Sequence, residues 1–167
     1  MKLELLWYIL LFVLLLMVQA LICNQICLFD CITPMVYVYL ALTFRINYPR
    51  WGVLAWCFTM GISVDIFSNT PGVGAASMTL IGLIQPYMLE LFMPRDSQEN
   101  FQPTMKTLGY SKYSWYTVII VFIYCLTFYT LEAFNLFHWL QWLGSVFGST
   151  ALTALLIISI ERLRTSS

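Results

Sequence analysis

The stretch GISVDIFSNTPGVGAAS (residues 61–77) joins two apolar runs and contains the clearest turn in the chain. Pro71 fixes its backbone φ angle, whereas Gly72 and Gly74 are free to adopt positive φ values, so the stretch predicts a tight, rigid hairpin between two helices. Asp65 lies just before this turn. Gly61 precedes Asp65 by four residues, one helical turn. The small residues Gly72, Gly74, Ala75, Ala76 and Ser77 would let the start of the second helix approach a neighbour closely.

Apolar runs like these two continue along the whole chain. Of its 167 residues, 60% are apolar and 10% charged, whereas soluble domains have about 45–50% and about 25%. A spanning helix needs about 20 apolar residues. The sequence therefore predicts an all-α polytopic membrane protein, one domain over residues 1–167, with six transmembrane helices near residues 5–23, 26–44, 51–67, 73–92, 115–134 and 139–160.

The first two predicted spans differ from the other four. The first run resembles a signal peptide, but it continues to Cys23 and further spans follow, which favours an uncleaved signal anchor over a cleaved leader. The second predicted span is built on the apolar stretch over 32–44, which is shorter than a full span and borrows residues back toward Ile26. Basic residues are retained on the cytoplasmic side, and six crossings place all eight on one side, with both termini cytoplasmic: Lys2, Arg45, Arg50, Arg95, Lys106, Lys112, Arg162 and Arg164.

Four polar or acidic residues lie inside the predicted spans, at a similar depth. At about 1.5 Å per helical residue, they fall at one level in the outer leaflet: Gln19, Asp30, Asp65 and Glu132. Such groups are costly in a bilayer and usually face a protein interior or water. They are either helix ends that reach headgroup water, or they form a shared polar cavity or a partner-docking face that is open to the outside.

Two further helix features have alternative interpretations. Gln85-Pro86 predicts a kink in the fourth helix, in which Gln85 satisfies the freed backbone group locally; the alternative is a gating role. Gly144 and Gly148 form a Gly-x-x-x-Gly pair, extended by Ser145 and Ser149. This pattern is typical of close helix packing, either inside the molecule or against a partner subunit or second copy.

The sequence contains little that indicates catalysis. The only histidine is His138, in a short outer loop, and no zinc-protease, nucleophile-elbow or phosphate-loop pattern is present. Cys23, Cys27 and Cys31 are spaced by four residues without an accompanying histidine, which favours packing over metal binding. The formal net charge is zero, so no basic footprint for nucleic acid exists. We predict no enzyme activity, no metal and no cofactor.

The hairpin carries a family resemblance. Gly61-Ile62-Ser63-Val64-Asp65, followed by Asn69-Thr70-Pro71-Gly72, resembles the signature of the rod shape-determining MreD family. In that family a Gly-x-x-x-Asp turn ends the third helix, and a Pro/Gly turn starts a helix of small residues. Chain size, six spans and cytoplasmic termini also agree. Gly72-Val73-Gly74 stands where many members have Pro-Leu-Gly, so the correspondence of single residues stops at Gly61, Asp65 and Pro71.

The resemblance implies a non-enzymatic scaffold subunit of the cell-elongation (rod-shape, peptidoglycan synthesis) machinery in the bacterial cytoplasmic membrane. Its expected partner is an MreC-type single-span periplasmic protein, and wider contacts include a RodA-type polymerase, a penicillin-binding transpeptidase, actin-like MreB and membrane lipid. The hairpin over 65–74 would hold the partner's membrane segment. The basic loop over 95–112 would meet cytoplasmic partners, unless its charges serve only topology.

A different class remains as the alternative. Substrate-binding subunits of vitamin transporters energised by an ATPase module are also small six-span proteins. The outer polar residues Gln19, Asp65 and Glu132 would then form a small-molecule site. The sequence favours the scaffold, because these residues do not form a recognisable convergent set of ligands.

Overall fold

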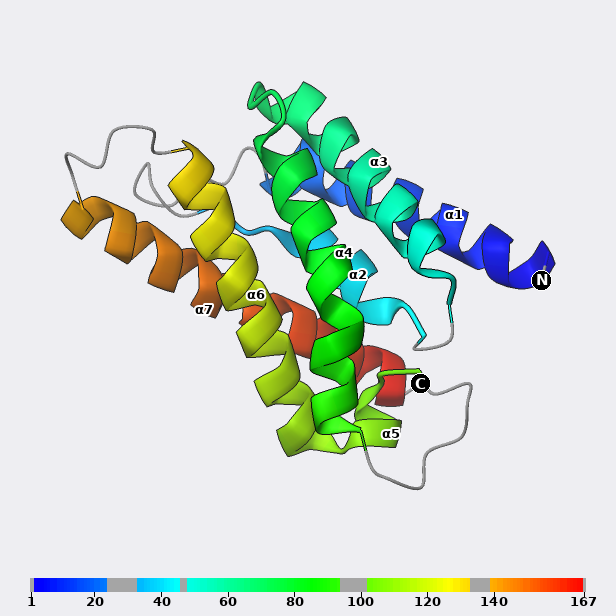
Figure 1. Cartoon of the computed structure of the whole chain (residues 1–167). Helices are drawn as coiled ribbons and strands as arrows, with labels where there is room; N and C mark the ends of the chain where they lie inside the picture. Colours follow the sequence, from blue (N-terminus) through cyan, green and yellow to red (C-terminus); the bar gives the residue numbers. More distant parts are fainter. Residues whose placement is uncertain (1, 24–32, 46–47, 94–101, 133–138, 167) are drawn as a thin grey trace.

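The computed structural model describes residues 2–23, 33–45, 48–93, 102–132 and 139–166 (Figure 1). These parts are helical and contain no strand. The five long helices are α1 (Lys2–Val18), which a π-helical turn continues over Gln19–Cys23, α3 (Arg50–Ser68), α4 (Val73–Phe92), α6 (Tyr110–Glu132) and α7 (Trp139–Ser166). Hydropathy alone predicts all five, and the predicted range of α4, 73–92, is the one observed.

Four of these helices, α3, α4, α6 and α7, are long and apolar enough to cross a membrane, whereas the apolar part of α1, Leu6–Leu21, is shorter. Large apolar side chains cover their outward faces, as at Ile66, Leu83 and Leu155. A chain with this surface is a multi-pass membrane protein, because water would not tolerate so much exposed apolar area. The total of six crossings and the cytoplasmic termini remain predictions.

The structure differs from the predicted helix over 26–44. Residues 24–32 lie outside the described parts, residues 33–35 are not helical, and only a 3-10 turn (Val36–Val38) and the short helix α2 (Tyr39–Thr43) follow. Pro34 provides one reason, because proline has no N–H and disfavours helix at the residue before it. The other is length: the predominantly apolar stretch over 32–44 has 13 residues and would make a helix of about 20 Å, against a bilayer core of about 30 Å.

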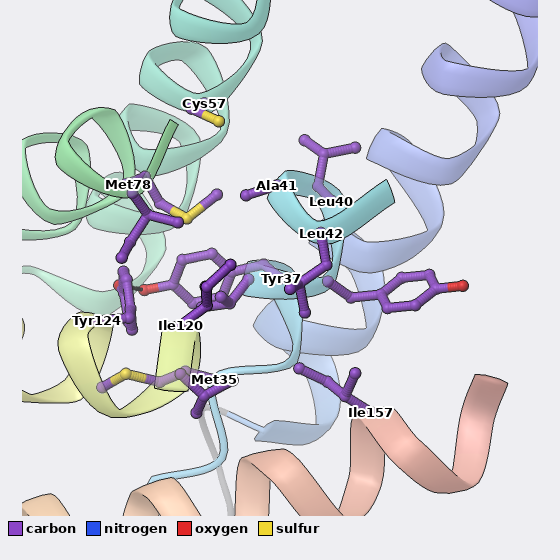
Figure 2. Close-up of a cluster of buried hydrophobic side chains, with 14 of the residues drawn as sticks. Met35, Tyr37, Leu40, Ala41, Leu42, Cys57, Met78, Ile120, Tyr124 and Ile157 are labelled. Carbon is purple, nitrogen blue, oxygen red and sulfur yellow. Dashed lines mark hydrogen bonds between the residues drawn. The ribbon is translucent and has the colours of Figure 1, made fainter. Parts of the chain in front are cut away.

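Residues 35–44, which we call the buried segment, form the centre of the molecule. Each of these residues is buried. Figure 2 shows Tyr37, Leu40 and Leu42 of this segment gathered with side chains from the surrounding helices, namely Cys57 of α3, Met78 of α4, Ile120 and Tyr124 of α6 and Ile157 of α7. Irregular backbone at membrane depth is tolerated where protein surrounds it, and the buried segment meets that condition.

The polar loop predicted between the fourth and fifth spans contains one further helix. α5 (Met105–Leu108) begins at a capping box, in which the Thr104 N–H donates to Thr107 Oγ1 at 3.0 Å. Met105 and Leu108 bury their side chains, and α6 then begins at Tyr110, five residues before the predicted start at 115. The sequence analysis missed this helix because its four residues are too few for a hydropathy signal.

Candidate partner-binding site

Asp65 lies in the last turn of α3 and caps the first turn of α4. Its Oδ1 accepts hydrogen bonds from Thr70 Oγ1 at 3.1 Å and the Gly74 N–H at 2.8 Å. Its Oδ2 accepts from the N–H groups of Gly72 at 3.1 Å and Ala75 at 2.9 Å. The first N–H groups of a helix have no partner within it, and a carboxylate there also complements the helix dipole. Asp65, only 5% exposed, therefore holds the two helices together.

Small residues make this capping geometry accessible. A methyl group on Gly61 would lie 2.4 Å from Ala75 Cα, and one on Gly74 would lie 2.5 Å from Asp65 Oδ1. The turn itself uses left-handed backbone at Asn69 (φ +56°) and Gly72 (φ +88°). The predicted tight hairpin and close helix approach are confirmed. A role for the hairpin in holding a partner stays a prediction.

Polar side chains from two other helices satisfy the backbone where the buried segment begins. Gln19 Nε2 donates to the Pro34 carbonyl at 3.1 Å, and the Val36 N–H donates to Gln19 Oε1 at 3.2 Å. The Met35 N–H donates to Thr153 Oγ1 of α7 at 3.0 Å. Buried backbone groups that lack a helical partner cost free energy unless another group pairs with them. Gln19 and Thr153 supply that pairing.

Tyrosines of the buried segment connect it to α6 and α7. Tyr37 hydrogen-bonds Tyr124 through their hydroxyls. The Tyr39 hydroxyl donates to Glu161 Oε2 at 2.5 Å and accepts from Arg164 Nη1 at 3.2 Å. Arg164 Nη1 also lies 3.7 Å from Glu161 Oε2. The sequence analysis interpreted Arg164 only as a topology signal and missed Glu161, which is 2% exposed.

The four outer polar residues have different surroundings. Gln19 pairs with backbone groups of Pro34 and Val36, whereas Asp65 pairs with backbone N–H groups of the hairpin and with the Thr70 hydroxyl. Glu132 is exposed at the end of α6, and Asp30 lies outside the described residues. Gln19 and Asp65 thus have a structural role, since each pairs with polar groups of the fold. A cavity shared by all four remains a prediction.

Gln85 and Pro86 both lie within α4. Gln85 was predicted to satisfy its own helix locally, but the buried side chain reaches further. Its Nε2 donates to the Phe44 carbonyl at 3.2 Å and to the Tyr116 hydroxyl at 3.3 Å. Phe44 ends the buried segment, so Gln85 joins that end to α4 and α6.

The small-residue motif on α7 has an inward and an outward side. Ser145 and Ser149 are buried, and Ser149 Oγ hydrogen-bonds the Tyr129 hydroxyl at 2.6 Å. Gly144 is exposed, and a methyl group there would meet no described atom within 4 Å. Gly144 thus presents bare backbone to the outside, which favours the partner or second-copy alternative over internal packing at this residue.

A groove between α6 and α7 continues this outward face. Its volume is about 630 Å³, and its wall is mainly apolar. We call it the α6–α7 groove; residues that line it include Val118, Phe122, Phe147, Ala151, Leu155 and Ile158. An apolar groove with an alanine at its wall suits a transmembrane helix, because small residues let helices approach closely in lipid.

Metal chemistry receives no support from the described residues, which contain no group of three or more histidine, cysteine or acidic side chains placed to hold an ion. Cys57 and Cys125 are buried thiols. Cys27, Cys31 and His138 lie outside the described residues, as does the side chain of Cys23.

Comparison with known proteins identifies no relative: no family model, curated protein or solved structure matches the chain. The function is therefore inferred from the residues and contacts described above.

Proposed function

We propose that the chain is a non-enzymatic scaffold subunit of the bacterial cell-elongation machinery, located in the cytoplasmic membrane, that holds an MreC-type single-span partner. One observation carries the proposal: the residues of the family resemblance build one structural unit. Asp65 caps α4, Gly61 permits the approach of Ala75, and Pro71 lies in the turn between them. The three residues to which the resemblance extends thus belong to one hydrogen-bonded hairpin, which supports the proposal.

We assign the partner's membrane segment to the α6–α7 groove rather than to the hairpin over 65–74, because Asp65 of the hairpin uses its carboxylate within the fold. Gly144 and Ala151 are exposed on the same helix, and Phe147 lies between them in the sequence and lines the groove. In lipid, helix association depends on packing and on close backbone approach, since the lipid tails are as apolar as the helices. The basic side of the membrane, which six crossings would make cytoplasmic, is where MreB, RodA-type and transpeptidase contacts are expected.

Gentle-detergent purification from native membranes with a C-terminal tag, followed by mass spectrometry, tests this proposal. The wild-type chain is expected to recover a single-span coiled-coil protein and wall-synthesis enzymes. Ala151→Leu enlarges a groove residue, and overpacking costs about 1–3 kcal/mol, so recovery of the single-span protein should fall about tenfold. Ala55→Leu is the matched control, because Ala55 is an exposed alanine of α3. Equal loss in both variants would count against the groove.

The vitamin-transporter alternative makes a different prediction in the same experiment. It requires polar groups that face a ligand, whereas the side chains of Gln19 and Asp65 form hydrogen bonds within the fold. Recovery of an ATPase pair with its coupling subunit, without a single-span coiled-coil protein, would overturn the scaffold proposal and favour this alternative.

A further inference from the structure

A second cavity lies between the beginning of α3 and the second half of α4, away from the α6–α7 groove. Its volume is about 200 Å³. Its wall combines apolar side chains, including Val53, Leu54 and Leu83, with polar ones. The polar side chains that line this α3–α4 pocket are Arg45, Tyr48, Arg50, Gln85, Tyr87 and Glu90.

Arg50 is held at this pocket by α4. Its Nη1 donates to the Tyr87 hydroxyl at 3.4 Å, and its Cζ lies 5.6 Å from the centre of the Tyr87 ring. A guanidinium has five N–H donors arranged in a planar fork that matches the oxygens of a phosphate. The bond to Tyr87 uses one donor, so it orients the group and leaves others for a ligand. Arg45, half-buried, brings a second guanidinium to the same pocket.

The second half of α4 adds an acidic side chain to the same wall. Glu90 lines the pocket, and its carboxylate supplies acceptor oxygens. Pro86, one helical turn before Glu90, lies inside α4 and also lines the pocket. The pocket thus offers cationic donors together with acceptors for hydroxyl groups.

The surroundings of the pocket point to lipid. Both helices that form it are long and apolar enough to span a membrane. Trp51, beside Arg50, is 86% exposed, and Leu83, in the wall itself, is 56% exposed. A tryptophan at this position is typical of the membrane interface. Basic pockets between membrane helices bind anionic lipid headgroups. A phosphate bound here would carry its acyl chains along the apolar wall.

We propose that the α3–α4 pocket binds the headgroup of an anionic phospholipid, with the phosphate on Arg45 and Arg50 and headgroup hydroxyls on Glu90. The charged side chains that line the pocket are two arginines and one glutamate, whose formal charges sum to +1 at neutral pH. A phosphodiester with an uncharged hydroxylated headgroup, as in phosphatidylglycerol, complements that charge. This inference does not depend on the scaffold proposal, because it uses neither the hairpin nor the α6–α7 groove.

Native mass spectrometry of the delipidated, full-length protein in neutral detergent tests the headgroup. Short-chain phosphatidylglycerol, phosphatidylethanolamine and phosphatidylcholine are titrated separately, and glycerol phosphate serves as the soluble phosphate. We expect saturable binding of phosphatidylglycerol, at least tenfold weaker binding of the two zwitterionic lipids, and no saturable binding of glycerol phosphate. Equal binding of the three lipids would overturn the proposal, as would glycerol phosphate binding as tightly as the lipid.

Arginine variants test the assigned contacts. A hydrogen bond to a charged group contributes about 1.5–3 kcal/mol, so Arg50→Gln should weaken phosphatidylglycerol binding about tenfold or more. Arg45→Gln should act in the same direction, and Arg50→Lys should keep part of the affinity. Lys112→Gln is the control, because Lys112 is an exposed basic residue of α6 that does not line this pocket.

The folding control uses Arg50, the first residue of α3, whose exposed position makes its replacement compatible with the fold. The lipid-free Arg50→Gln protein should unfold at the wild-type temperature. If Lys112→Gln weakens binding as much as Arg50→Gln, or if Arg50→Gln binds phosphatidylglycerol like the wild type, the pocket is not the lipid site.

Discussion

The α3–α4 hairpin and the buried segment differ in how far along the sequence the side chains lie that satisfy their backbone groups. Both contain backbone groups without a helical partner, and in both a polar side chain pairs with them. In the hairpin, Asp65 bonds to residues five to ten positions later. In the buried segment, the Met35 N–H donates to Thr153, 118 positions later, and the Phe44 carbonyl accepts from Gln85, 41 positions later. The hairpin is thus a local unit, whereas the buried segment depends on the assembled helices.

The largest effect should come from removing the acceptor in the hairpin. Asp65→Ala leaves the N–H groups of Gly72, Gly74 and Ala75 without the carboxylate that now accepts from them. We expect a loss of about 3–5 kcal/mol in unfolding free energy, in the range found when one partner of a buried charged interaction is removed. Thermal unfolding in detergent measures it.

Asp65→Asn serves as the matched variant, since it keeps one side-chain acceptor oxygen and should lie between the wild type and Asp65→Ala. If Asp65→Ala lowers the unfolding free energy by less than about 1 kcal/mol, the hairpin does not depend on its side-chain cap in the way proposed for the comparison with the buried segment. That result would mean that the turn residues hold the hairpin without the carboxylate.

A smaller loss of unfolding free energy is expected at Thr153 of α7, which pairs with the buried segment. Thr153→Val keeps the side-chain shape but removes the acceptor of the Met35 N–H. A buried donor without a partner costs about 1–3 kcal/mol, which the same unfolding measurement would detect.

Thr59→Val is the control for that substitution. Thr59 is exposed on α3, and its hydroxyl donates to the Ala55 carbonyl one turn earlier at 2.7 Å. We expect a change within about 0.5 kcal/mol. Similar results for Thr153→Val and Thr59→Val would show that the contact between α7 and the buried segment is dispensable.

The smallest loss of unfolding free energy is expected from neutralising Glu161, the acid beside Tyr39. Glu161→Gln keeps an acceptor for the Tyr39 hydroxyl but removes the ion pair with Arg164, whose side chain is 39% exposed. Because solvent screens such a pair, the loss should be about 1 kcal/mol or less, and it should shrink as salt concentration rises. A loss as large as that of Asp65→Ala would remove the distinction between the two regions.

The contrast also explains what the sequence could predict. Long apolar runs identified α3, α4, α6 and α7, and Pro71 with its neighbouring glycines identified the turn, because those signals lie within a few residues. Asp65 was singled out by its position before that turn, although the atoms that it binds were not foreseen.

The central position of the buried segment could not be predicted from local sequence signals. Its apolar residues look like part of a spanning helix, and only three-dimensional packing places them at the centre. Thr153 and Glu161 gave no signal, since threonine is common in helices that cross membranes and an acid near the last basic residues looks like a helix end. Their partners lie more than a hundred positions earlier in the chain.

The distance between Met35 and Thr153 has a consequence for synthesis. Ribosomes add about 5–20 residues per second, so the 118 positions that separate these residues take about 6–24 s to make. During that interval the Met35 N–H has no Thr153 to meet. The early part of the chain must therefore wait, in contact with water, lipid or an insertion factor, until the last helix enters the membrane and completes its surroundings.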